Sequence, residues 1–207
     1  MSPPDYTSTT SPDCVASRPG SLGERFLQSA FNTEDRARKF YEDQVVDRLN
    51  HEMAAFVRRM ELAFIATSDS DGECDATLRA GEPGFIRVLD DRHVAYPEFR
   101  GNGVMASLGN IKENPHVGML MVDFTRDLIG LHVNGRAEIV EDDEFRRMYD
   151  VDERKAERWV VVEIEEAYIH CRKHIPRMVA VDRNRDWGTD DVKRKGGDYF
   201  GVRSSRA

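Results

Sequence analysis

Apolar residues recur along this chain with two different periods. Over residues 34–60 they return every three or four positions, which predicts one amphipathic helix with an apolar stripe facing a core. From residue 61 the period shortens to two, which is typical of β-strands. Strands are predicted over residues 61–68, 73–80, 84–90, 92–98, 116–124, 128–135 with a continuation to 142, and 157–170. Further helices are predicted over residues 104–113 and 142–149.

The connections between the predicted strands indicate how the strands pair. The first four are separated by only a few residues, among them the turn formers Asp69 and Gly72. Parallel neighbours need a long crossover, so we expect a four-stranded antiparallel meander. About six to eight such strands would close as a barrel without exposed edges. The strand over residues 61–68 has apolar residues on both faces, so both faces are expected to be buried.

The segment FRGNGVMASLGN, residues 99–110, contains a glycine pattern found in nucleotide-binding proteins. Gly101, Gly103 and Ala106 form G-x-G-x-x-A, a form of the Rossmann fingerprint. A Rossmann fold alternates strands with helices, whereas only one helix is predicted within residues 61–140, so this fold is disfavoured. The loop can instead hold a phosphate through backbone amides and the N-terminus of the next helix. A tight turn that merely caps this helix is an equal alternative.

Composition narrows the classes of function. The 207-residue chain carries a net charge of −8, which argues against a nucleic-acid partner. Its three widely spaced cysteines do not indicate a disulfide framework and favour the cytoplasm. Neither a membrane-spanning apolar run nor a signal peptide is recognised. Residues 1–25 are predicted to be a disordered arm, residues 26–181 the folded domain with its N-terminal helices, and residues 182–207 a tail able to contact a dimer partner.

A series of motifs between residues 74 and 140 carries a family resemblance. A strand ending in arginine precedes GFIRVLDDRHVAYPEF, a Gly-Asn loop, SLGNIKENP, an apolar strand and VNGRA. This order resembles the pyridoxamine 5′-phosphate oxidase-like FMN-binding split barrels. The resemblance implies a mainly β fold, a six-stranded antiparallel split barrel with flanking helices. It also implies a homodimer with FMN at the subunit interface, and an oxidoreductase acting on a small molecule that the sequence does not identify.

The resemblance further implies which residues contact the cofactor. The strand arginine and the polar loop residues would hold the phosphate, the Tyr-Pro-Glu segment would line the flavin ring, and an Asp-Phe pair would approach from the opposite subunit. These residues are Arg79, Tyr96, Pro97, Glu98, Arg100, Asn102, Ser107, Asp123 and Phe124. Many relatives have arginine directly after the Gly-Asn pair, where this chain has Gly103. Arg100 or Lys112 would then supply the missing positive charge.

Histidines form a second group of candidates. His170 and His174 lie four residues apart in HCRKH, but no cluster completes a set of four ligands, so we expect no metal. With Lys173, they form either a cationic mouth for an anionic substrate or a solvated strand end. His132 either faces the flavin cavity or is a hydrogen-bonded barrel residue. Trp187 either stacks on the flavin from the partner's tail or packs on a nearby surface.

Two other functions compete with an FMN oxidoreductase. A bound flavin supplies the electron chemistry itself, so the lack of a recognisable acid–base pair leaves the reaction open. The first alternative is a flavin or haem carrier or sensor without turnover. The second is a reductase that uses a deazaflavin in the same groove. Neither a nucleic acid nor a membrane is expected as a partner.

Overall fold

The computed structural model describes residues 19–149, 156–181, 191 and 197–202. The chain divides into two compact units, Met1–Val45 and Val46–Ala207, which are described separately below. Residues 1–18 of the expected arm lie outside the described residues, as do most of the tail and Trp187.

The first unit contains two helices, α1 (Leu22–Ala30) and α2 (Glu34–Gln44). The hydroxyl of Ser21 accepts a hydrogen bond from the backbone amide of Glu24 and so caps α1, which begins within the region expected to be an arm. The hydroxyl of Tyr41 in α2 donates to Glu24 and accepts from Gln28, and these bonds join the two helices. Neither helix contains a buried residue.

The single helix predicted over residues 34–60 is wrong, because the chain is extended in its middle. Val45 leaves the helical region, and Val46 forms an antiparallel bridge with Ala167. A new helix, α3 (His51–Arg59), starts where the side chain of Asn50 accepts a bond from the Met53 amide. The apolar spacing continues across this break, so periodicity alone could not reveal it.

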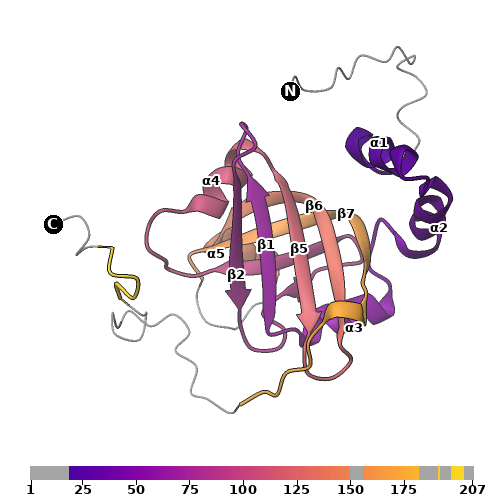
Figure 1. Cartoon of the computed structure of the whole chain (residues 1–207). Helices are drawn as coiled ribbons and strands as arrows, with labels where there is room; N and C mark the ends of the chain where they lie inside the picture. Colours follow the sequence, from indigo (N-terminus) through magenta and orange to yellow (C-terminus); the bar gives the residue numbers. More distant parts are fainter. Residues whose placement is uncertain (1–18, 150–155, 182–190, 192–196, 203–207) are drawn as a thin grey trace. The chain divides into compact units, whose positions relative to one another are not determined.

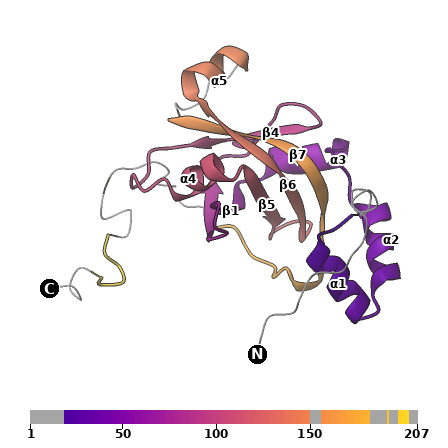
Figure 2. The same ribbon diagram turned by 90° about the horizontal axis from the view of Figure 1, so that it is seen from above.

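The second unit is built on one antiparallel sheet of seven strands, the number expected from the hydrophobic pattern and one more than the six that the family resemblance implies (Figures 1 and 2). The strand order is β2-β1-β5-β6-β7-β4-β3. The strands are β1 (Leu62–Ser68), β2 (Cys74–Ala80), β3 (Arg87–Val88), β4 (His93–Glu98), β5 (His116–Asp123), β6 (Ile129–Glu141) and β7 (Arg158–His170). The remaining elements are α4 (Ala106–Glu113), α5 (Asp142–Met148) and a short 3-10 turn, η2 (Arg172–His174). This mainly β split-barrel architecture with flanking helices confirms the predicted fold class, and all strand pairs of the described sheet are antiparallel.

The predicted four-stranded meander is wrong, because β2 and β3 lie at opposite edges of the sheet. The turn after β2 includes Gly84, whose φ of +93° belongs to the left-handed region that glycine tolerates best. Phe85 and Ile86 then enter the core, and this burial draws the chain away from β2. As a result, β2 and β4 approach each other through side chains instead of a backbone ladder.

Two clusters of buried side chains support this sheet. The larger one joins α3 and α4 to the inward residues of the strands and includes Tyr96, Met119 and Val133. In the smaller one, the rings of Phe145 and Trp159 stack with centroids 4.1 Å apart. None of the helices in the described part of the chain has the length and apolar content needed to cross a membrane.

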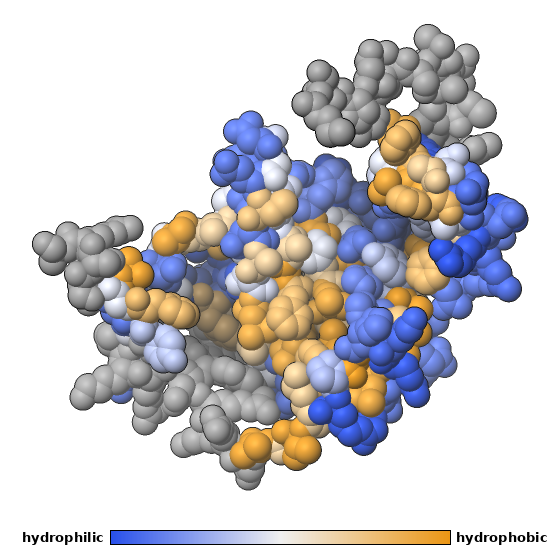
Figure 3. Space-filling view, in the orientation of Figure 1, coloured by the Kyte–Doolittle hydropathy of each residue, from blue (hydrophilic) through white to orange (hydrophobic). Residues whose placement is uncertain are grey.

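The outward face of β1 and β2 is apolar and exposed. Ala63, Ile65 and Thr67 of β1 are buried, but Phe64 between them is 43% exposed. Leu78, its direct partner on β2, is 54% exposed. Figure 3 shows the hydrophobic patch over these strands. The expectation that both faces of β1 are buried is wrong for the described chain, because no described element covers the outer one.

Candidate functional site

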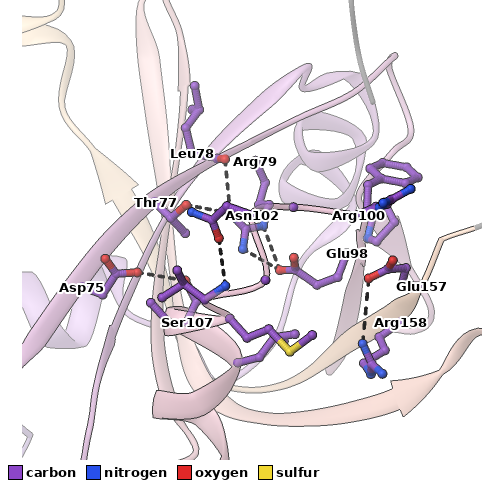
Figure 4. Close-up of a pocket in the computed structure, with 18 of the residues that line it drawn as sticks. Asp75, Thr77, Leu78, Arg79, Glu98, Arg100, Asn102, Ser107, Glu157 and Arg158 are labelled. Atoms are coloured by element: carbon purple, nitrogen blue, oxygen red, sulfur yellow. Dashed lines mark hydrogen bonds and ion pairs between the residues drawn. The ribbon is translucent and has the colours of Figure 1, made fainter. Parts of the chain in front are cut away.

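A cavity of about 860 Å³ lies at the opening between β2 and β4 (Figure 4). Its wall continues through the glycine loop after β4, the first turn of α4 and the start of β7. Six of the predicted cofactor residues line it, namely Arg79, Pro97, Glu98, Arg100, Asn102 and Ser107. The structure therefore brings together most of the residues selected through the family resemblance.

Arg79 of β2 and Glu98 of β4 form an ion pair inside this cavity. The Nε and Nη2 atoms of Arg79 lie 2.8 and 2.7 Å from Oε1 of Glu98. The Nη1 atom donates to the hydroxyl of Thr77 at 2.6 Å and to the carbonyl of Leu78 at 3.3 Å. Both charged side chains are largely buried, with 21% and 11% of their side-chain surface exposed. The pair spans the opening between two strands that are not neighbours in the sheet.

Burial makes Glu98 an unusual carboxylate. Loss of solvent raises the pKa of Glu98 above its ordinary value, and the attraction of Arg79 offsets only part of this rise. Tyr96, two residues earlier on the same side of β4, is fully buried, and its hydroxyl has no hydrogen-bond partner among the described residues. Burial, together with the nearby charge of Glu98, raises the pKa of Tyr96. Tyr96 belongs to the core and does not line the cavity.

The glycine loop forms the opposite wall of the cavity. Gly103 has a φ of +85°, so a side chain at this position would strain the backbone. The side-chain oxygen of Asn102 accepts a bond from the amide of Val104 at 3.0 Å. Met105, also in the left-handed region, precedes α4, which begins two residues later than predicted. The chain thus makes a sharp turn into α4, whose first residues line the cavity beside Asn102 (Figure 4).

Helix α4 is fixed to the sheet by polar side chains. Ser107 is buried, and its hydroxyl donates to Asp75 of β2 at 3.0 Å. Asn110 donates to the hydroxyl of Thr67 on β1 at 3.1 Å. Asn114, at the end of the helix, donates to Ser68 at 2.9 Å. These bonds hold the N-terminus of α4 beside β2.

Two predicted site residues lie elsewhere. Asp123 ends β5, and its carboxylate organises the turn that follows. It accepts bonds from the backbone amides of Thr125, Arg126 and Asp127 and lies 3.3 Å from Nη2 of Arg59. Burial alone would raise the pKa of Asp123, but the backbone hydrogen bonds outweigh it and lower the pKa. Neither Asp123 nor Phe124 lines the cavity.

The predicted mouth residues separate into two groups, neither of which lines the cavity. On the outward face of the sheet, Nε2 of His132 lies 3.0 Å from Nδ1 of His170. The ring of His132 also stacks on Tyr168, and burial followed by the charge of His170 lowers the pKa of His132. Lys173 and His174 are exposed in η2, just beyond this pair. Trp187 lies outside the described residues.

Sequence reasoning missed four polar residues of the cavity wall. Asp75 and Thr77 alternate with Arg79 along β2, so a period-two pattern placed all three on one face. Glu157 immediately precedes β7, and Arg158, the first residue of β7, is the register partner of Glu98. No local signal identifies this second pair, because its position depends on how β7 pairs with β4.

The chain is similar to several proteins of known structure. The HupZ protein of group A Streptococcus superposes on 63% of this chain and 99% of its own, with 19% identity and a TM-score of 0.47. A pyridoxamine 5′-phosphate oxidase-like protein of Lactobacillus delbrueckii matches 59% of this chain and 95% of its own, with 25% identity and a TM-score of 0.47. An F420 reductase matches 59% and 98%, with 18% identity and a TM-score of 0.39.

The comparison with protein-family models identifies the family. No curated protein matches the chain. The family model described as pyridoxamine 5′-phosphate oxidase matches residues 49–171, which include α3, every strand of the sheet and the cavity. Since this match extends over more than half of the sequence, the chain belongs to the pyridoxamine 5′-phosphate oxidase family.

Proposed function

We propose that this protein binds FMN in the cavity between β2 and β4 and uses it as an oxidoreductase on a small molecule. The observation that carries the proposal is the position of Arg79 across from the glycine loop, with both lining one cavity. A guanidinium and a row of backbone amides are the groups that bind phosphate best in proteins. Family membership supports a flavin-type ligand.

The residues present fit a flavin phosphate. The volume of about 860 Å³ lies within the range of small-molecule sites. Gly103 permits a close approach of the backbone, and the amides at the start of α4 carry a favourable dipole for an anion. The hydroxyl of Ser107 lies at the same end of the cavity. The carboxylate of Glu98 disfavours a bound anion, because it already neutralises the charge of Arg79.

In this proposal the chain binds and orients, and the cofactor supplies the redox chemistry. Bound FMN would accept or donate a hydride equivalent. Arg79 and the loop would anchor the phosphate, while Pro97 and Glu98 would limit where the ring system lies. Asn102 keeps the loop in its sharp turn through its bond to Val104.

A homodimer is part of the same proposal. The exposed faces of Phe64 and Leu78 make an apolar patch that would be covered in a dimer. Leu78 also lines the cavity, so a second copy on this face would reach the cofactor. The pair formed by His132 and His170 would then lie at the interface. A Phe64→Glu variant should be monomeric in light scattering, whereas an Ala55→Glu control at an exposed position of α3 should match the wild type.

A cytoplasmic location is a further part of the proposal. Cys74 and Cys171 are free and exposed, which is compatible with a reducing cytoplasm.

A flavin carrier without turnover is the alternative function, and reduction by a nicotinamide donor under stopped-flow conditions would distinguish it from an oxidoreductase.

Titration with FMN tests the assignment directly. Arg79→Ala removes a charge-assisted phosphate contact, so binding should weaken by about 1.5–3 kcal/mol. Riboflavin lacks the phosphate, and its affinity should change far less in the same variant. Arg136→Ala removes an exposed arginine outside the cavity wall and serves as the matched control. An unchanged FMN dissociation constant in Arg79→Ala would contradict the proposed phosphate site.

A further inference from the structure

Glu98 occupies the side of Arg79 that a phosphate would use. Two of the three guanidinium nitrogens, Nε and Nη2, contact one oxygen of Glu98. The third, Nη1, is directed toward Thr77 and the carbonyl of Leu78. A bound phosphate would therefore compete with the carboxylate for Nε and Nη2, the edge that makes bidentate contacts with anions.

The other charges around Glu98 determine what happens when it is displaced. Arg158 of β7 is its register partner, but the Nε atom of Arg158 lies 3.1 Å from a carboxylate oxygen of Glu141, and its Nη1 lies 4.0 Å from Glu157. The backbone carbonyl of Glu98 accepts the amide of Glu157, which fixes the strand position. Arg100 and Asp75 also line the cavity. Displaced Glu98 would thus share the cavity with a phosphate and two other acidic side chains, while Arg158 is held by Glu141 and Arg100 is the remaining lining cation.

We infer that Glu98 is a built-in competitor at the anion site, and that FMN binds by displacing its carboxylate from Arg79 while the carboxylate takes up one proton. This inference rests on the proposed function. The proton comes from solvent and goes to a side-chain oxygen of Glu98, so the bound state exchanges one ion pair on Arg79 for another. The neutral carboxyl then becomes a hydrogen-bond donor, in place of an anion facing an anion.

The burial of Glu98 indicates that its displaced carboxylate takes up a proton instead of moving into water. Glu98 is 8% exposed as a residue, and Pro97 restricts the backbone beside it. An ionised carboxylate separated from Arg79 in this position would be a buried charge without its counter-ion, which is strongly disfavoured. The raised pKa of Glu98 in the free protein points in the same direction.

The inference predicts a specific dependence on pH. Between about pH 7 and 8.5, the phosphate of FMN is almost entirely a dianion, because its second pKa is ~6. Coupled uptake of one proton weakens FMN binding by up to about tenfold for each unit of rising pH. Glu98→Gln should give a nearly flat profile and, at the upper end of this range, a dissociation constant at least about tenfold lower than that of the wild type. Riboflavin should show neither effect.

Two measurements on the whole chain test the inference that FMN displaces Glu98. Fluorescence titrations of FMN and riboflavin compare the wild type with Glu98→Gln across the pH range, and riboflavin binding shows that the variant is folded. Calorimetry of the wild type in buffers of different ionisation enthalpy counts the protons taken up. Uptake close to one, abolished in Glu98→Gln, supports the inference. Equal FMN profiles in both proteins, or no proton uptake, overturn it while leaving the proposed flavin site intact. If neither protein binds FMN at any pH, the proposed function fails as well.

Discussion

Two buried carboxylates of this protein, Asp123 and Glu98, behave in opposite ways. Their residues are almost equally hidden, at 6% and 8% exposure, and each lies beside an arginine. Asp123 closes a turn at the end of β5, and its pKa is lowered. Glu98 lies at the cavity between β2 and β4, and its pKa is raised. The exposed fraction of the residue therefore does not by itself account for the difference.

The difference lies in the number of donors. Three backbone amides and the hydroxyl of Thr125 converge on Asp123, and Arg59 is an additional partner. Glu98 receives its side-chain bonds from Arg79 alone among the interactions described. Fixed backbone donors favour the ionised form without any rearrangement, whereas one side chain can be drawn away by a ligand. A carboxylate that accepts hydrogen bonds from the backbone stabilises the fold, whereas a carboxylate bound by a single guanidinium can be displaced from it by a ligand.

The largest effect that tests this comparison is expected at Asp123. Asp123→Asn keeps the shape but removes the charge and one acceptor, so the amide of Asp127 loses its partner and the guanidinium of Arg59 keeps only its ion pair with Asp127. Hydrogen bonds to charged groups contribute about 1.5–3 kcal/mol, and the free energy of unfolding should fall by about 2 kcal/mol. Urea denaturation at neutral pH measures it. A loss below about 0.5 kcal/mol would show that the turn does not depend on this carboxylate.

A smaller effect is expected at Glu98. Glu98→Gln removes a charge whose burial is costly, but it also removes the counter-ion of Arg79. Arg79 keeps its bonds to Thr77 and to the carbonyl of Leu78 and faces the cavity, so it is not left without polar partners, and the free energy of unfolding should fall by about 1 kcal/mol. The same denaturation experiment applies, with Asp123→Asn as the reference. A loss as large as that of the reference would show that the ion pair holds the sheet together and is not poised for exchange.

The sequence predicted the strands better than their arrangement. Short apolar segments located β1, β5, β6 and β7 correctly, with clean alternation at the start of β6 and almost continuous apolar residues in β5, because each strand has a core on one side. The apolar pattern could not show that α2 ends at Gln44, since the extended segment follows from the bridge between Val46 and Ala167. Nor could it separate β2 from β3, because the turn between them is short in either arrangement.

The candidate site was predicted through motifs rather than spacing. The family resemblance selected Arg79 and the residues around Gly103, and these line one cavity. It selected Asp123 as well, which the structure places in a turn outside that cavity. The competition between Glu98 and an anion could not be foreseen, because it depends on a contact between two strands that do not pair.

The smallest predicted effect is a pair of pH dependences with opposite signs. The pKa of Asp123 is lower in the folded chain than the ordinary 3.8, so its contribution to stability is present above that value and is lost as the pH falls through the folded pKa. The pKa of Glu98 is raised above 4.5, so the folded state holds the proton more tightly, and stability falls as the pH rises through this window.

For Asp123, the advantage in stability of the wild type over Asp123→Asn should therefore grow with pH and then level off. The stability of Glu98→Gln relative to the wild type should increase as the pH rises above about 4.5, where the wild type must bury a charge. Unfolding free energies of the three proteins over this acidic range test both signs, and parallel curves would mean that the two carboxylates do not differ in the way their donors indicate.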